Sequence, residues 1–257
     1  MKTADNVFSS ELDERGIAYS VTIEGLYEIQ IHSQTVIVNL ENIRRNYERD
    51  SDADAIVRFV DKVDTDFITE TPSWDDVRQY IRYSLEPSDE EEFKGVVFNA
   101  ISDELNQVFI YISVDGSRIT WIDKSMIDNW GITREQMVHQ AEHNMVAILA
   151  ETKFEIEDID GNKLGMLSTT EIAFKASLIV SPAFRDLVAP THGWPVYVVV
   201  PCRDFVYVIS EDNLDFLSCL GSIVIDEYRK SGYPITKDVL QISDDGITAI
   251  GTYPEPN

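Results

Sequence analysis

This 257-residue sequence has few basic residues and no long apolar runs. It holds 21 Lys and Arg residues against 46 Asp and Glu residues, a net charge of −25 at neutral pH. Nucleic acid is normally met by basic patches, so we expect no direct binding to DNA or RNA. An anionic membrane surface is disfavoured for the same reason. No stretch approaches the roughly 20 apolar residues that span a bilayer.

Cysteines and targeting signals are also scarce. Cys202 and Cys219 are the two cysteines of the chain. The first six residues carry one lysine and then an acid, and no apolar secretion core follows them. We therefore expect a cytoplasmic protein with two reduced thiols, while the sequence alone leaves a disulfide open.

Signatures of cofactor chemistry are missing as well. The sequence has no glycine-rich loop of the phosphate-binding kind and no Gly-x-Ser-x-Gly nucleophile elbow. We expect no cofactor. No catalytic group stands with the partners that its chemistry would require at the right spacing.

What is present is an ordinary globular composition, 44% hydrophobic and 26% charged. Residues 1–65 predict an N-terminal α-β-β-β-α-α unit. Its elements are a helix over 3–15, short strands over 17–23, 26–31 and 35–40, and helices over 42–50 and 54–63. The strands are rich in β-branched residues and are separated by short polar turns, which is hairpin spacing.

Residues 66–94 are predicted as a helical bridge followed by an acidic loop. Ser73 could cap a helix that carries Val77, Tyr80, Ile81 and Leu85. The acidic run over residues 86–92 is typical of a surface loop or linker.

A C-terminal unit over residues 95–257 is predicted from further hairpins and helices. Asp115-Gly116, Asp160-Gly161 and Asp245-Gly246 are hairpin turn signals, and Thr133 with Gln136 forms a capping box that opens a long helix. Residues 195–200 and 205–209 form an apolar strand pair, and a helix is predicted over 213–230. The fold class that follows is α+β, with two sequential units of antiparallel strands and helices packed on one face.

Several short motifs, taken in order, carry a family resemblance. They lie at residues 36–43, 120–123, 130–133, 141–144, 198–201 and 234–236. In their order and spacing the sequence resembles the YtpQ-like family, a bacterial family of unknown function. The resemblance implies no substrate, cofactor or catalytic residue.

One stretch suggests zinc chemistry. His139, Glu142 and His143 fit His-x-x-Glu-His, in which two histidines one helical turn apart hold zinc and the acid acts as a base. On a helical wheel, however, Met137, Ala141 and Met145 define the core face and the two histidines fall opposite it. A solvent-facing pair is therefore favoured, and a zinc-dependent hydrolase stays the alternative.

Three residues are candidates for binding. Arg203 and Asp204 occupy the turn between two apolar strands, where the guanidinium could pair with Asp204 or reach an anionic group on a partner. Asn144 lies toward the core side of its helix, where bridging backbone groups is favoured over binding a ligand. Cys202 beside Arg203 could be paired with His192 as a reactive thiol, but packing at a strand end is favoured.

The negative field and the tryptophans at element ends indicate a function in protein recognition. We expect a non-enzymatic interaction module that engages itself or a basic protein. The alternatives are the zinc-dependent hydrolase and an acidic inhibitor that mimics nucleic acid.

Overall fold

The structure is a computed structural model, which describes residues 3–22, 26–31, 34–38, 40–65, 72–88, 93, 95–113, 119–170 and 174–254. The chain divides into two compact units. The first comprises Met1–Glu70 with Lys230–Tyr233, and the second comprises Thr71–Arg229 with Pro234–Asn257. The predicted turns at residues 24–25 and 115–116 lie outside the described residues.

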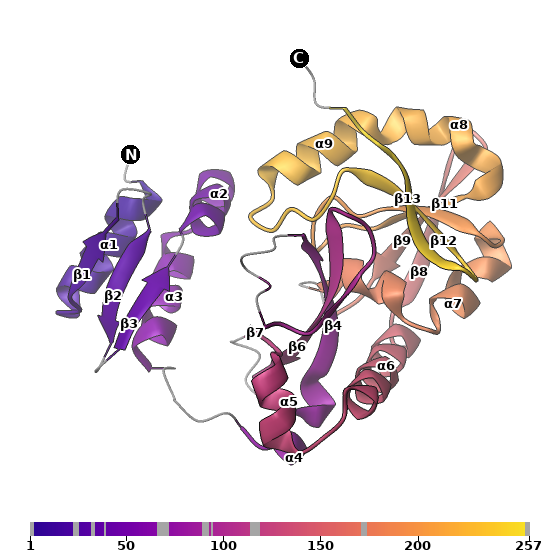
Figure 1. Ribbon diagram of the computed structural model, residues 1–257. Helices are drawn as coiled ribbons and strands as arrows, with labels where there is room; N and C mark the ends of the chain where they lie inside the picture. The colour runs from indigo at the N-terminus through magenta and orange to yellow at the C-terminus, as the bar shows by residue number, and fades with distance from the viewer. Residues whose placement is uncertain are drawn as a thin grey trace. The chain divides into compact units, whose positions relative to one another are not determined.

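The first unit follows the predicted order of elements (Figure 1). They are α1 (Ala4–Glu14), β1 (Tyr19–Val21), β2 (Tyr27–Ile31), β3 (Gln34–Val38), α2 (Glu41–Asp50) and α3 (Ala53–Thr65). Thr3 caps α1, and Gly16 lies at φ +67° just beyond its end, a conformation that glycine adopts without strain. The strands form an antiparallel sheet in the order β1-β2-β3.

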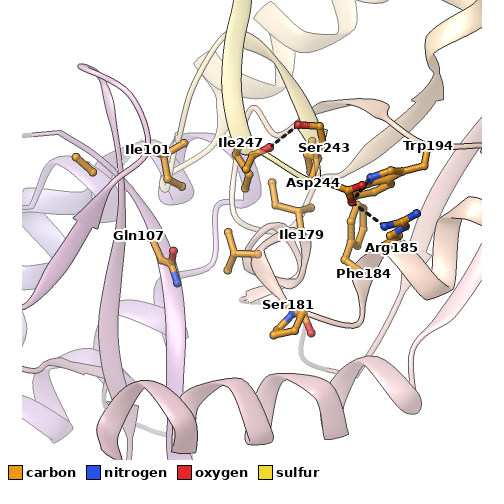
Figure 2. Close-up of a pocket in the computed structure, with 15 residues that line it drawn as sticks. Ile101, Gln107, Ile179, Ser181, Phe184, Arg185, Trp194, Ser243, Asp244 and Ile247 are labelled. Carbon is orange, nitrogen blue, oxygen red and sulfur yellow. Dashed lines mark hydrogen bonds and ion pairs between the residues drawn. The ribbon is translucent and has the colours of Figure 1, made fainter. Parts of the chain in front are cut away.

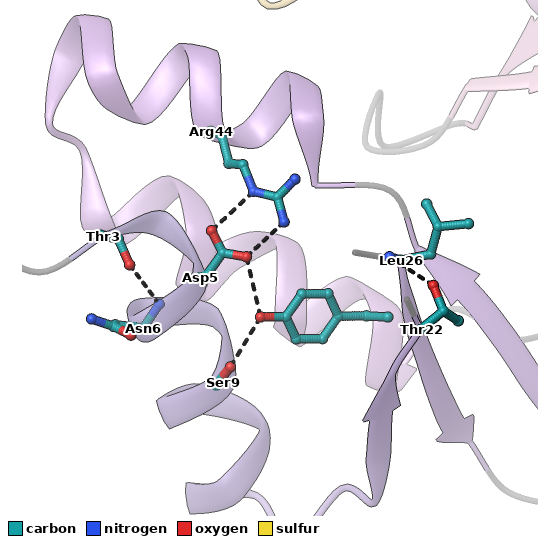
Figure 3. Close-up of polar contacts among 8 residues, drawn as sticks. Thr3, Asp5, Asn6, Ser9, Thr22, Leu26 and Arg44 are labelled. Carbon is teal, nitrogen blue, oxygen red and sulfur yellow. Dashed lines mark hydrogen bonds and ion pairs between the residues drawn. The ribbon is translucent and has the colours of Figure 1, made fainter. Parts of the chain in front are cut away.

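Helices pack on one face of this small sheet. Phe8 and Leu12 of α1, Ile29 of β2 and Val60 of α3 are fully buried in one apolar cluster. A polar network adds to this packing (Figure 3). Arg44 of α2 donates to both carboxylate oxygens of Asp5, at 2.9 and 2.7 Å, and Tyr27 donates to the same carboxylate at 3.3 Å. The hydrogen bonds from Arg44 lower the pKa of Asp5 below its usual range, so the network stays charged at neutral pH.

The second unit contains two antiparallel sheets. One holds β4 (Ile81–Pro87), β6 (Leu105–Ile112) and β5 (Phe98–Ala100) in that order, with β7 (Ile119–Trp121) also paired to β6. The other has the order β13-β12-β10-β11-β9-β8. Its strands are β8 (Lys153–Ile159), β9 (Asn162–Ser168), β10 (Val196–Val199), β11 (Tyr207–Ser210), β12 (Asp238–Ser243) and β13 (Gly246–Thr252). The α+β class with antiparallel sheets is confirmed.

The helices of this unit surround the sheets (Figure 1). They are α4 (Trp74–Val77), α5 (Lys124–Trp130), α6 (Arg134–Ala150), α7 (Phe184–His192), α8 (Leu214–Leu217) and α9 (Gly221–Lys230). Short 3-10 turns include η1 (Arg78–Tyr80) and η3 (Ala176–Val180). The predicted capping box of Thr133 and Gln136 is present at the start of α6.

Two apolar clusters meet at β10, which is buried on both faces. Val196 and Val198 lie in the main cluster, which also contains Phe109 of β6. Tyr197 and Val199 lie in a second cluster that α8 and α9 cover. The described helices include none that is both long and apolar enough to cross a membrane.

The prediction of a single helix that carries Val77, Tyr80, Ile81 and Leu85 is wrong. A helical turn ends at residue 80, and the rest of the segment is β4, which pairs with β6 along its whole length. Ile81 and Leu85 fit a helical period, but with Tyr83 they also fit a strand period of two. Glu86, predicted in a surface loop, is buried in that strand. The described part of the predicted bridge, residues 72–88 and 93, thus belongs to the second unit.

Candidate functional site

The feature of the second unit that best suits recognition is a pair of cavities beside β13. One has a volume of about 540 Å³ and the other of about 560 Å³. Ile101 lines both of them, and so does β13. Six of the seven residues of β13 take part: Gly246 and Ile247 in the first, and Thr248, Ala249, Gly251 and Thr252 in the second. We refer to the two cavities together as the β13 cleft.

The first cavity lies between the two sheets (Figure 2). Gln107 comes from β6 and Ile101 from the turn between β5 and β6, and Ile247 faces them from β13. Ile179 of η3 and Phe184 of α7 lie between these walls. Polar and apolar groups contribute about equally to the surface of this cavity, with the polar groups at defined positions.

Polar side chains gather at one rim of this cavity. Asp244, in the turn between β12 and β13, accepts hydrogen bonds from Arg185 Nη1 at 2.7 Å and from Trp194 Nε1 at 2.9 Å. The Arg185 guanidinium also lies over the Trp194 ring, 5.5 Å from its centroid. Tryptophan and arginine are the residue types most enriched among the energetic anchors of protein interfaces. Their mutual contacts hold both side chains ready at the rim.

The second cavity is acidic. Its walls carry Asp103 and Glu104, both exposed in the turn between β5 and β6, and the buried Asp238 of β12. Asp238 accepts a hydrogen bond from Thr252. The described residues that line this cavity include no lysine or arginine. A cationic group is the ligand that such walls attract.

Asn144 has a structural position. It is buried in α6 and donates to the carbonyl oxygens of Arg78, at 2.7 Å, and Ile81, at 3.0 Å. Its own oxygen accepts from Gln140 at 2.8 Å. Both amide hydrogens and the oxygen are therefore engaged in tying α6 to the start of β4.

Arg203 and Asp204 do not pair with each other in the hydrogen bonds and ion pairs found among the described residues. Arg203 reaches Glu86 of β4 at 2.5 Å, and both side chains are largely buried. Asp204 is exposed and accepts from the Cys202 thiol at 3.0 Å. The two candidates thus face different surroundings, and neither lines the β13 cleft.

The histidines of the zincin-like stretch lie on the outside of α6. His139 and His143 are exposed, and Glu142 is half-buried. Among the described residues, no group of three or more His, Cys, Asp or Glu side chains gathers as metal ligands would. The arrangement differs from the closed site with a third protein ligand that the zincin pattern requires.

Cys202 and His192 flank β10 at its opposite ends, so they do not form a reactive pair. Cys202 is buried and Cys219 is exposed, and both are free thiols. His192 is buried at the end of α7, where its ring packs edge-on against Phe154. Packing, the favoured interpretation for Cys202, agrees with this burial.

The β13 cleft is the site that sequence reasoning missed. The Asp245-Gly246 turn correctly predicted the last hairpin, but nothing in it showed which strand would end the sheet. One signal was available: the strand after the turn carries no charge in a chain where charge is plentiful.

Comparison with models of protein families, with curated proteins and with solved structures finds no match to this chain. The resemblance to the YtpQ-like family therefore stays a prediction from the sequence.

Proposed function

We propose that this chain is a non-enzymatic protein-interaction module, which binds a segment of another polypeptide in the β13 cleft. The observation that carries the proposal is the cleft itself. It combines apolar side chains, a Trp–Arg rim and an edge strand around two cavities that share Ile101 and β13. These are the elements from which peptide-binding grooves are built.

The setting of the module is part of the proposal. Two free thiols suit a reducing compartment such as the cytoplasm. The net charge of −25 speeds the encounter with a positively charged partner. The field therefore favours a basic protein over a second copy of this chain, which would bring the same negative charge.

A peptide-display selection on the full chain tests this function. Peptides recovered by selection are titrated into the protein and into two variants, Arg185→Ala and Arg58→Ala. Arg185 lies at the rim of the cleft, whereas Arg58 is an equally exposed, ion-paired arginine of the first unit. We expect Arg185→Ala to weaken binding about tenfold or more, because rim arginines of this kind act as anchors.

The control variant should bind as the unchanged protein does. Recovery of no binding peptide, or an equal loss in both variants, would show that the cleft is not a peptide site. Thermal unfolding of both variants confirms that each retains its fold.

A further inference from the structure

The two edges of the six-stranded sheet differ in composition. β8 carries Lys153, Glu155, Glu157 and Asp158 among its seven residues. β13 has the sequence GITAIGT and carries no charge. Charges and prolines on an edge strand prevent another strand from adding to it. By this measure β8 is protected by charge, whereas β13 has no charge and only the bulge at Ile250 to oppose a further strand.

The backbone of β13 can receive such a strand. β13 pairs with β12 in antiparallel register over residues 246–249, and a β-bulge at Ile250 shifts the register before Gly251. In the regular part, an antiparallel neighbour takes the N–H and C=O groups of alternate residues. The groups of the remaining residues turn away from β12. Six of the seven residues of β13 line the cleft, so open space lies beside the strand.

The acidic residues of the second cavity indicate which charge a bound segment should carry. Asp103 and Glu104 line the second cavity together with Thr248 and Thr252 of β13. A segment lying against β13 would point alternate side chains toward one face of the sheet. Lysine or arginine at those alternate positions would meet the two carboxylates, whereas aspartate or glutamate would be repelled.

We propose that the partner segment adds to the six-stranded sheet as an extended strand beside β13, with alternate basic side chains directed at Asp103 and Glu104. This inference rests on the proposed function and defines its partner chemistry. Main-chain hydrogen bonds to β13 supply affinity, and the acidic wall supplies selectivity. The occupant is a basic segment of another protein.

Three synthetic peptides of seven residues, the length of β13, provide the test. The first alternates lysine with valine, and the second replaces each lysine by glutamate. The third is the lysine peptide with N-methyl groups on alternate amides, which blocks one edge of its backbone. Each is titrated into the full chain at low salt. We expect the lysine peptide to bind, the glutamate peptide not to bind, and methylation to weaken binding at least tenfold.

Two variants locate the binding strand. Thr248→Lys places a charge on β13, and Ile156→Lys places the same charge at an exposed position of β8. Thr248→Lys should reduce the affinity for the lysine peptide at least tenfold, and Ile156→Lys should leave it unchanged. Hydrogen–deuterium exchange should show slower exchange in 246–252 on binding and none of this protection in 153–159.

Several outcomes would overturn the inference. They are equal binding of the lysine and glutamate peptides, no effect of N-methylation, equal effects of the two variants, or no binding of the lysine peptide. A concentration-dependent dimer that protects β13 would assign the edge to a second copy instead. If displayed peptides still bind in an Arg185-dependent way, the proposed function stands while this inference falls.

Discussion

The carboxylate of Glu86 lies inside the second unit, between two partners from different parts of the chain. It accepts from Arg203 at 2.5 Å and from the buried Ser84 at 2.6 Å. A buried ion pair of this kind adds little net stability over apolar packing, because both charges leave water. Removal of one charged partner alone nevertheless lowers stability strongly, since the remaining charge stays buried without its partner.

Replacement of the arginine alone should therefore destabilise the protein strongly. We expect Arg203→Met to lower the free energy of unfolding by about 3 kcal/mol. The double variant Glu86→Gln with Arg203→Met should lose less than the sum of the single losses. Arg185→Met, at an exposed ion pair, should lose less than about 1 kcal/mol. Urea denaturation measures all of these, and a small loss in Arg203→Met would show that the pair is not held as the structure has it.

His192 makes stability depend on pH. Burial lowers the pKa of His192 below the usual value of about 6.5, and a hydrogen bond with the Lys163 backbone offsets only part of this effect. The unfolded state therefore binds a proton more readily than the folded state. The contribution of neutral His192 to the free energy of unfolding is therefore complete above about pH 6.5. As the pH falls through and below about 6.5, this contribution is lost by at most about 1.4 kcal/mol per pH unit.

We expect His192→Gln to flatten this dependence. Between about pH 7.5 and pH 5.5, its free energy of unfolding should fall less than that of the unchanged protein. His143→Gln alters an exposed histidine and should leave the slope as it is. A His192→Gln slope equal to that of the unchanged protein would mean that the buried ring does not titrate differently on unfolding.

The sequence was enough to identify individual polar residues of interest, but not the residues that they contact. Arg203 was identified in the turn between two apolar strands and Asn144 on the core side of its helix, where a polar side chain needs a partner. The partner of Arg203 is Glu86, which is 117 residues away in the sequence. No local spacing could identify it, because the contact exists only after the two sheets have formed.

At the scale of elements, Asn144 joins α6 to the start of β4. Asn144→Ala would remove the two hydrogen bonds that its amide donates to the carbonyls of Ile81 and Arg78, each of which keeps one other donor. We expect a loss of about 2 kcal/mol in the free energy of unfolding. His143→Ala, one residue earlier on the exposed face, should change it by less than about 0.5 kcal/mol. Equal losses in the two variants would contradict the structural position of Asn144.

Elements with local signals were predicted well, and those decided by distant pairing were not. The Thr133–Gln136 capping box and the glycine at residue 131, at φ +64°, fix helix ends within a few residues. The hairpin turn at residues 160–161 is equally local, with positive φ at both positions. β4 failed because its apolar residues fit both periods, and the choice depends on pairing with β6.

At the scale of the whole molecule, the sheet order is the part that the sequence could not give. The chain's own hairpins, β8–β9 and β12–β13, are visible from their turns, but the insertion of β10 between β11 and β12 is not. That order places β13 at an edge, and the edge is what creates the candidate site. The composition of the sequence was enough to suggest a protein-interaction module. The position of the candidate site, by contrast, follows only from the order of the strands in the sheet.

Added salt should raise the stability of this protein and lower its affinity for a basic segment. With a net charge of −25, like charges repel one another in the compact state, and added salt screens this repulsion over distances of about 10 Å at about 0.1 M and about 3 Å at about 1 M. The urea midpoint should therefore rise with sodium chloride. The same screening weakens the attraction between the acidic wall and a basic segment, so the affinity of the lysine peptide should fall over the same series.

Both quantities are best measured on one preparation in chloride, because sulfate would also strengthen apolar burial. Opposite trends would show that charge opposes the fold and favours the complex. If stability and affinity rose together, apolar contact would dominate the binding, and the acidic wall of the β13 cleft would not select the partner. A midpoint that fell with salt would instead mean that ion pairs such as Arg44–Asp5 outweigh the general repulsion.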